Sequence, residues 1–257
     1  MIPISLQVQL TSPAYLSSQG TAGNFLHSLD HIPGRTLLGA AAWAWIDAGG
    51  DPEGSDFREL FLSGEVSWGD LRVVPSDAEL EGMPDPTGQP LVAPLTSMLC
   101  KLDPVRHGVQ DTLLVRPRGP EGKGAASFKE RICGFHQSTA GKGHQRCEAG
   151  LDRCEGSLFY RSVLRHPASP AAPRQAGPAW QVIRVHKQRR THVSISPLLG
   201  TARHGALYSR EVLEEDQWFQ GELLCSSQAL ADRVSELLMA LPLAIGGGRS
   251  RGYGVLK

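Results

Sequence analysis

The sequence lacks the features that would place it in a membrane or on a secretory route. None of its apolar runs approaches the ~18 residues that a membrane span requires, and its first ten residues have neither a basic segment nor a long apolar core. We therefore expect a soluble, cytoplasmic protein with no membrane partner. A chain of 257 residues allows one large domain or two small ones, and we expect two compact halves.

Acidic residues are absent from one long stretch. Between Gly156 and Arg210 there is no Asp or Glu, whereas this stretch carries nine Lys and Arg residues and four histidines. Acids are concentrated instead at 47–85 and 211–236, so a net charge of zero hides a segregated pattern. A basic face is typical of proteins that bind a polyanion, and an acidic face can dock a protein partner. The alternative is a surface on which the two kinds of segment neutralise each other.

The run GGGRSRGYG near the end of the sequence combines five glycines with two arginines. Glycine has no Cβ, so a phosphate can approach the main chain closely while arginines supply charge and a tyrosine ring stacks on a base. We predict that RNA contacts here come from Gly246, Gly247, Gly248, Arg249, Arg251, Gly252, Tyr253 and Gly254. The alternative is a flexible glycine turn before a last strand.

A second group of RNA-binding candidates comes from the acid-free stretch and from the start of an expected helix. These candidates are Arg189, Arg190, His192, Arg203, His204 and Tyr208, together with Arg35. The alternative is that these arginines are ordinary surface residues and that Tyr208 belongs to the core.

Hydrophobic periodicity predicts the main elements at both ends of the chain. Residues 4–10 alternate as a half-buried strand does, and residues 36–48 and 226–241 show the spacing of helices with one buried face. Further strands are expected from Trp180 to residue 225. Proline-rich stretches at 75–94 and 167–178 cannot be central strands or helices, so we expect them to be loops that frame an inserted region.

An IPG turn that introduces the first helix, together with the Arg-Gly-rich loop after the last helix, forms a specific combination. It resembles the RAMP superfamily of CRISPR-associated proteins. The turn is part of IPGRTLLG at 32–39, and the segment 191–223 is similar to the type III subunits that cap the 5′ handle of the crRNA, particularly the type III-D member.

The resemblance implies an α+β fold with two ferredoxin-like, RRM-related halves, each with an antiparallel sheet. We expect an N-terminal half at 1–90, an inserted loop-rich region at 91–178 and a C-terminal half at 179–257. The implied function is that of a noncatalytic RNA-binding subunit in a type III effector complex. Its expected partners are the crRNA, the RAMP backbone subunits and the large signalling subunit, with target RNA bound indirectly.

The five cysteines of a cytoplasmic chain rarely form disulfides, which leaves metal ligands or plain thiols. Several Cys and His residues are close together in a glycine-rich stretch that has few apolar residues for a core. We predict a structural zinc site whose ligands are Cys133, His136, Cys147 and Cys154, with His144 a weaker choice and Cys100 a substitute if its loop folds back. Free thiols are the alternative, and Cys225 is expected in the core.

Two other functions fit part of the pattern. Some relatives cleave precursor RNA without metal by means of a histidine near the first helix, where His31 and His27 lie. Neither histidine has a lysine or tyrosine beside it in the sequence to stabilise the developing charge. Target cleavage would need an aspartate before the turn, where Asp30 is the only acid. A general RNA-binding module would explain the charges and the glycine loop, but it would not explain the IPG turn.

Overall fold

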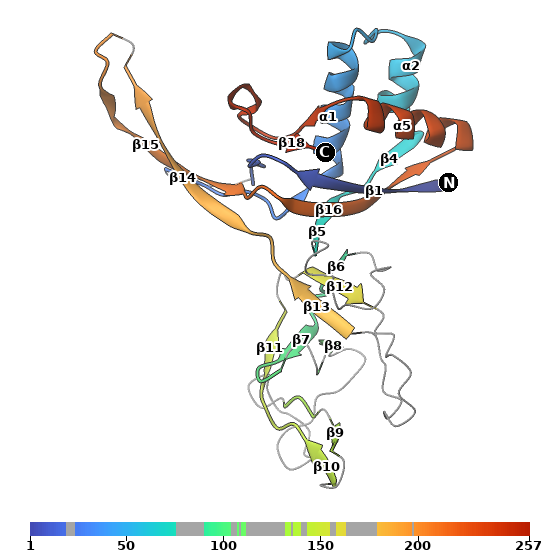
Figure 1. The fold of residues 1–257 in the computed structure, drawn as a ribbon, viewed down its shortest axis with the longest axis vertical. Helices are drawn as coiled ribbons and strands as arrows, with labels where there is room; N and C mark the ends of the chain where they lie inside the picture. Colours follow the sequence, from blue (N-terminus) through green and yellow to red (C-terminus); the bar gives the residue numbers. More distant parts are fainter. Residues whose placement is uncertain are drawn as a thin grey trace. The chain divides into compact units, whose positions relative to one another are not determined.

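Strands dominate the fold, and the chain forms two compact units. The computed structural model describes residues 1–18, 24–75, 90–103, 107, 109–111, 132–134, 136–139, 143–154, 158–162, 179–196 and 198–257. Unit 1 consists of 1–76 and 185–257, and unit 2 consists of 77–184 (Figure 1). No helix in this described part is both long and apolar enough to span a membrane.

Unit 1 is built on a seven-stranded antiparallel sheet whose strands come from both ends of the chain. Its path is β17-β18-β1-β16-β5-β3, and β4 pairs with β16 beside β5. The strands are β1 (Ile2–Leu10), β3 (His31–Ile32), β4 (Val66–Trp68), β5 (Leu71–Val74), β16 (Gln217–Cys225), β17 (Leu243–Ala244) and β18 (Val255–Leu256).

β1 and β16 pair along their whole length, from Ile2 opposite Cys225 to Leu10 opposite Gln217. Both strands bury alternate residues, such as Leu10 and Phe219, which confirms the strand predicted at 4–10. The sequence had suggested a separate sheet for each half, and this expectation is corrected because the two ends share one sheet. The reason is that each strand completes the backbone hydrogen bonds and apolar face of the other.

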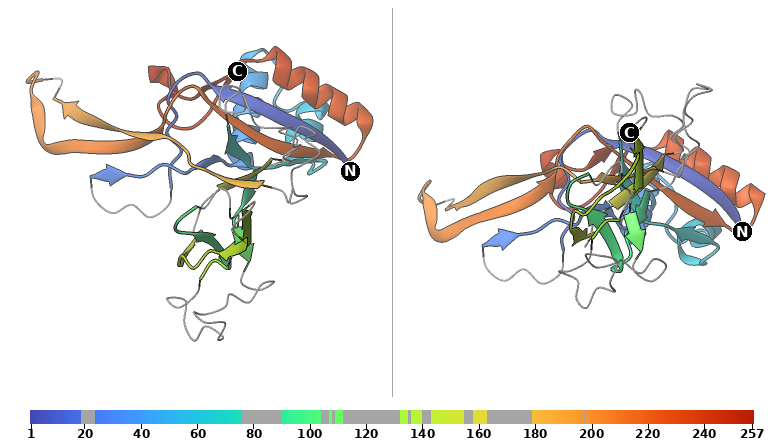
Figure 2. Two further views of the ribbon diagram at one scale, coloured as in Figure 1. Left: turned by 60° about the horizontal axis from the view of Figure 1, so that its bottom comes forward. Right: turned by 90° about the horizontal axis from the view of Figure 1, so that it is seen from below.

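Two helices cover one face of this sheet, as Figures 1 and 2 show. α1 (Gly34–Asp47) contacts β4 and β17, and α5 (Gln228–Ala240) contacts β1 and β16. The short α2 (Ser55–Phe57) and the π-helix η1 (Arg58–Leu62) follow α1. Both helices predicted from periodicity are confirmed. The buried face of α5 contains Leu230, Val234 and Leu237, as the spacing predicts.

The IPG turn has a structural reason. Pro33 caps the start of α1, and the Gly34 amide donates a hydrogen bond to Asp70 Oδ1 at 2.9 Å. A Cβ at Gly34 would lie 1.9 Å from the Trp68 carbonyl oxygen, so only glycine lets the helix begin this close to β4.

A long hairpin extends beyond the end of the large sheet in both Figure 1 and Figure 2. β14 (Lys187–Ile195) and β15 (Ala202–Leu213) pair antiparallel, and the short β2 (Phe25–Leu26) adds to β15 in parallel. This three-stranded sheet positions most of the basic residues that the sequence analysis selected.

Unit 2 consists of small antiparallel sheets, ordered β11-β7-β8, β13-β12-β6 and β10-β9. The strands are β6 (Pro90–Val92), β7 (Ser97–Cys100), β8 (Val109–Asp111), β9 (His136–Thr139), β10 (Gly143–Arg146), β11 (Leu151–Arg153), β12 (Leu158–Ser162) and β13 (Ala179–Ile183). Of the two proline-rich stretches, residues 76–89 and 163–178 lie outside the described residues, and β6 is an edge strand.

Candidate nucleic-acid interface and metal cluster

The glycine loop, residues 246–254, has a backbone that only glycine permits at several positions. Gly246, Gly248, Gly252 and Gly254 all have positive φ angles, between 72° and 88°. A Cβ on Gly246 would lie 2.3 Å from the Tyr15 carbonyl oxygen, and one on Gly254 would lie 2.0 Å from that of Ile245. The loop is therefore held in one shape against the chain rather than being a free turn.

The main-chain amides of this loop differ in their hydrogen bonds, and those of Arg251, Gly252 and Tyr253 donate to carbonyl oxygens of the loop itself. Those of Gly247 and Gly254 donate to the carbonyl oxygens of Tyr15 and Pro13 at 2.9 and 2.8 Å. The amides of Gly246, Gly248, Arg249 and Ser250 form no hydrogen bond with the residues that the structure describes. Three of these amides, those at 248–250, are successive along the chain, which is the arrangement in which main-chain N–H groups bind an anion.

One face of the hairpin lies against this loop. Strand alternation and the register, in which Arg190 is opposite Arg210, place four side chains on this arginine face: Arg190, His192, Tyr208 and Arg210. The Arg190 guanidinium lies 5.3 Å from the centre of the Tyr253 ring and donates to the Tyr253 hydroxyl at 3.2 Å.

Aromatic rings also hold the second arginine of this face. The Arg210 guanidinium lies 5.0 Å from the Tyr15 ring and 5.2 Å from the Tyr208 ring. The Tyr208 ring stacks on His192 with a centroid distance of 5.3 Å. Since Tyr15 also bridges to Gly247, the rings join the hairpin to the glycine loop.

The arginine face carries positive charge that no carboxylate pairs with in the described part of the chain. Neither Arg190 nor Arg210 forms an ion pair among the described residues, and Arg210 Nε is buried without a hydrogen-bond partner there. Burial lowers the pKa of His192, and the charges of Arg210, Arg251 and Arg190 lower it further. Arg251 therefore belongs to the same positive region, which suits a polyanion.

The remaining RNA-binding candidates do not all lie in this region. The Arg249 guanidinium lies 5.6 Å from the ring of Trp43, whose side chain is exposed on α1. Arg35 is exposed near the start of the same helix. Arg189 lies on the opposite face of the hairpin, 4.5 Å from the Phe25 ring. The side chains of Arg203 and His204 lie outside the described residues.

The sequence analysis did not select three residues that contribute to the arginine face or contact the glycine loop: Tyr15, Trp43 and Arg210. Arg210 ends the acid-free stretch, so its charge pattern was a usable signal. Tyr15 and Trp43 carried no signal, because only the tertiary fold brings each of them to an arginine.

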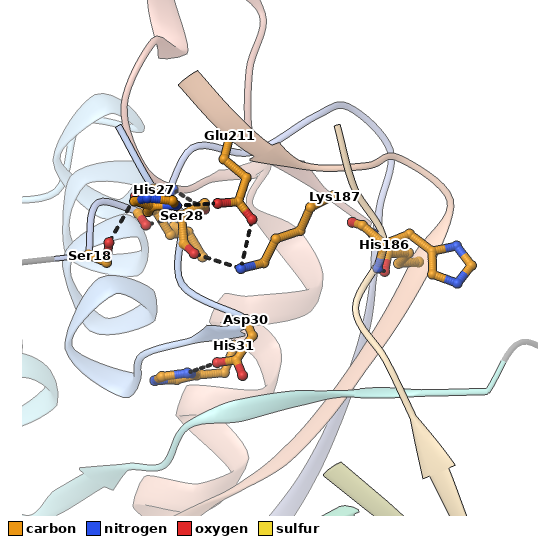
Figure 3. Close-up of polar contacts among 10 residues, drawn as sticks. Ser18, His27, Ser28, Asp30, His31, His186, Lys187 and Glu211 are labelled. Carbon is orange, nitrogen blue, oxygen red and sulfur yellow. Dashed lines mark hydrogen bonds and ion pairs between the residues drawn. The ribbon is translucent and has the colours of Figure 1, made fainter. Parts of the chain in front are cut away.

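The opposite face of the hairpin, which we call the network face, holds paired charges (Figure 3). Glu211 accepts from Lys187 at 3.1 Å and contacts His27 Nδ1 at 2.9 Å, while Lys187 also donates to the Ser28 carbonyl at 2.8 Å. Burial raises the pKa of Glu211, but the hydrogen bonds from His27 and Lys187 outweigh this effect and hold the pKa below its ordinary value.

His31 is surrounded by carboxylates. Its Nδ1 lies 2.9 Å from Asp30 Oδ1, and its Nε2 lies 3.8 Å from Asp70 Oδ2. The hydrogen bond with His31 holds the pKa of Asp30 below its ordinary value.

Unit 2 contains a cluster that is able to hold a metal ion. The ligand atoms of Cys100, His107, Cys133 and Cys147, here called the metal cluster, all lie within 4.8 Å of one another. Burial raises the pKa of the Cys100 thiol, but hydrogen bonds from the main chain of Asp103 and the side chain of His107 outweigh it and lower the pKa to about 7. Thiolate at this position is the form that binds metal.

The metal cluster shares only part of the predicted ligand set. Cys133 and Cys147 belong to it, and Cys100 takes part as the substitute weighed above. Cys154 lies elsewhere, in an apolar cluster with Ala93, and burial raises the pKa of its thiol to about 11. The side chains of His136 and His144 lie outside the described residues. His107 was missed, although it follows Cys100 by only seven residues. Cys225 is fully buried, as expected.

Comparison with known proteins identifies the family. The model of the RAMP superfamily matches residues 23–257, so the chain belongs to that superfamily. No curated protein matches the chain in sequence.

Among solved structures, the chain is similar to one from the "Cryo-EM structure of the Type III-B Cmr-beta bound to cognate target RNA". The identity is 10%, the TM-score is 0.49, and the match covers 100% of this chain and 96% of that one. A chain from the apo state of Type III-B Cmr-beta has 12% identity and a TM-score of 0.49, and the match covers 99% and 95% of the two chains.

Proposed function

We propose that the protein is a noncatalytic RNA-binding subunit of a type III CRISPR effector complex, and that it grips the 5′ handle of the crRNA. Membership of the RAMP superfamily supports the general class. The similar chains come from Type III-B Cmr-beta assemblies, one of them bound to cognate target RNA, which agrees with this class. The proposed location is the cytoplasm.

The observation that carries the proposal is the pair of arginines across the hairpin. Arg190 and Arg210 occupy opposite register positions, although like charges placed directly opposite each other destabilise a sheet. Each guanidinium is held by tyrosine rings rather than by a carboxylate, which leaves N–H groups for another acceptor. An RNA phosphate is such an acceptor, and it would relieve the repulsion between the two arginines.

The glycine loop would complete this binding surface. Its three successive amides at 248–250, which form no hydrogen bond among the described residues, can donate to phosphate oxygens, and Arg249 and Arg251 add charge beside them. Tyr253 of the loop contacts Arg190 of the hairpin, so the two elements lie side by side. A handle nucleotide bound at this point would therefore contact both of them. Arg35, Arg189, Arg203, His204 and the loop glycines remain proposed RNA contacts.

The finer features expected of the fold are also proposed. Six elements of unit 1 come along the chain in the order strand, helix, strand, strand, helix, strand (β1, α1, β5, β16, α5, β18), and their strands lie in the sheet in the order β18-β1-β16-β5. This order supports one ferredoxin-like, RRM-related arrangement built from both ends of the chain. The division at 1–90, 91–178 and 179–257 stays a prediction, as does a structural role for zinc in the middle region.

The proposed partners are RAMP backbone subunits, the large signalling subunit and, indirectly, target RNA. The acidic residues around α2 and α5 are candidates for protein contacts, since Arg233 there is already paired with Asp56 and Glu59 at 3.0 and 2.6 Å. Residues 47–59 and 228–240 contain seven acidic and only two basic residues, so the net charge of these segments is negative.

The test is binding of the purified protein to a crRNA with its 5′ handle, compared with the same RNA whose handle is scrambled, on a gel that also reports cleavage. We expect tighter binding to the intact handle and no cleavage. Equal affinity for both RNAs would contradict handle recognition and leave a general RNA-binding module.

A second function is favoured by one observation, the position of Lys187. Glu211 joins Lys187 to His27, so a lysine and a histidine meet in space although they are far apart in sequence. Such a pair suits metal-independent RNA cleavage, with His27 as general acid or base and Lys187 stabilising the phosphorane. His31, the residue first considered, faces two carboxylates.

Cleavage within the repeat RNA that is lost in His27→Ala and retained in His31→Ala would establish this second function in place of the noncatalytic one. Absence of cleavage by the wild-type protein under conditions where it binds the handle would rule it out.

A further inference from the structure

We infer that Cys100, His107, Cys133 and Cys147 form a closed Cys₃His zinc site that holds the core of unit 2 together. This inference deepens the proposed structural role for zinc with a new ligand set. It does not depend on RNA binding by unit 1, because its observations and its test concern unit 2 alone.

Three of the six ligand separations in the metal cluster are close to those of a tetrahedral zinc site, and the other three are no longer than 4.8 Å. Zinc bonds of ~2.3 Å to sulfur and ~2.0–2.1 Å to nitrogen imply ligand separations of about 3.8 Å between two sulfurs and about 3.5 Å between sulfur and nitrogen. Cys100 Sγ and Cys147 Sγ are 3.8 Å apart. His107 Nδ1 lies 3.2 Å from Cys100 Sγ and 3.5 Å from Cys133 Sγ.

The ligand types select the metal and its role. Three thiolates and one imidazole in tetrahedral geometry favour zinc over magnesium or calcium, which prefer oxygen. Four protein ligands leave no open position for water or substrate, so the site is structural rather than catalytic.

A side chain outside the ligand set supports this assignment. Gln110 on β8 donates from Nε2 to the Cys133 carbonyl at 2.7 Å, and the same nitrogen lies 3.6 Å from Cys133 Sγ. Outer contacts of this kind orient metal ligands and stabilise negative charge on sulfur.

The site explains how unit 2 forms a core from so few apolar residues. Among the described residues, the buried cluster around it consists of Met98, Cys100, Cys133 and Leu151, with Cys147 and Ala149 packed against it. The ligands come from the end of β7, from His107 and from segments at 132–134 and 147–150, which are joined by main-chain bonds such as Cys133 N to Ala149 O at 2.8 Å. A zinc ion would link all of these segments at one point and would couple their folding to metal binding.

The test is the zinc content of the full-length protein, purified from cells grown with zinc and measured by mass spectrometry against protein concentration. We expect one zinc per chain in the wild type and loss of bound zinc in Cys100→Ser, His107→Ala and Cys147→Ser. The matched controls are Cys154→Ala and Cys225→Ala, which remove buried thiols outside the cluster and should keep one zinc. Loss of zinc in Cys154→Ala but not in Cys100→Ser would overturn the ligand set.

A second measurement needs no variant, and so it is unaffected if a ligand variant fails to fold. Wild-type protein reconstituted with cobalt(II) should show the visible bands of a tetrahedral ion and charge transfer from three thiolates, and zinc should displace it. Octahedral cobalt bands, or failure of the folded chain to bind either ion, would overturn the site. Neither result would bear on the RNA proposal, because no RNA is present.

Discussion

The two faces of the β14–β15 hairpin are formed by the same strands but differ in how their charges are paired. On the network face, Glu211 is paired with Lys187 and His27, so charge is neutralised within the protein. On the arginine face, the adjacent residue Arg210 rests on Tyr15 and Tyr208 and has no acid beside it in the part of the chain described. Neighbouring residues differ in this way because side chains alternate across a strand.

The difference shows that a charged side chain indicates a binding site only when the residues that contact it are also known. The network face stabilises the attachment of residues 25–28 to the hairpin, because the charges of Glu211 and Lys187 are satisfied locally. The arginine face retains repulsion that rings offset only in part, by about 0.5–2 kcal/mol for each cation–π contact. Unneutralised charge of this kind points to an external anion, and four predictions test the contrast.

The largest effect is expected from Arg190→Ala combined with Arg210→Ala. Each charged hydrogen bond to RNA contributes roughly 1.5–3 kcal/mol, so the pair should weaken binding to the handle by about 3–6 kcal/mol. The salt dependence of the affinity should fall by about one phosphate contact for each arginine. The measurement is a binding titration at several salt concentrations.

Lys187→Ala is the matched control for this double variant, since it removes a positive charge from the network face of the same hairpin. We expect it to leave affinity nearly unchanged. An equal loss in both variants would mean that the hairpin contributes only general positive charge.

Arg249→Ala combined with Arg251→Ala should weaken handle binding by a smaller amount, of a few kcal/mol at most, on the same scale per bond. Both side chains are exposed, and the ring contact of Arg249 is with a single exposed tryptophan, so they are less firmly positioned than Arg190 and Arg210. Unchanged affinity together with an unchanged salt slope would remove the glycine loop from the RNA site.

Tyr253→Phe removes one hydroxyl and keeps the ring beside Arg190. The lost hydrogen bond is expected to reduce handle affinity by about 0.5–1.5 kcal/mol through poorer positioning of the guanidinium. Isothermal titration should show this loss in the wild-type background and none in an Arg190→Ala background. Additive losses from Tyr253→Phe and Arg190→Ala would argue against coupling between the Tyr253 hydroxyl and the Arg190 guanidinium.

The smallest effect concerns the stability of the network face. The pKa of Glu211 is lowered in the folded state, so its contribution is present above its unfolded pKa of about 4.3 and is lost as pH falls through the lower folded value. Urea unfolding at several acidic pH values should show this loss in the wild type. Glu211→Gln should be less stable at neutral pH by about 1 kcal/mol or less, and its stability should vary less with acid. A variant with the wild-type pH profile would contradict this role.

Much of unit 1 was predictable because its signals are local. The alternation in β1, the buried stripe of α5 and the glycines that need positive φ each depend on residues close together in sequence. The pairing of β1 with β16 was not predictable, since it joins residues more than two hundred positions apart. Alternation shows that a segment forms a strand, but it does not show which strand is its neighbour.

The candidate sites, like the fold, were predictable only in part. The close spacing of cysteines and histidines indicated a metal, yet Cys154 carries the same thiol as Cys100 and lies in a different apolar cluster. Only the folding of β7 and β8 around residue 107 brings His107 to Cys100 and Cys133.

The sequence by itself determined where positive charge, glycine and cysteine are concentrated, and which segments alternate as strands or repeat as helices. Tertiary structure alone decided that both ends of the chain share one sheet, that Tyr15 and Tyr253 hold the two opposed arginines, and that four residues of unit 2 converge. The physical reason is that composition and periodicity are properties of neighbours along the chain, whereas pairing, register and ligand geometry depend on which distant segments bury one another's surfaces.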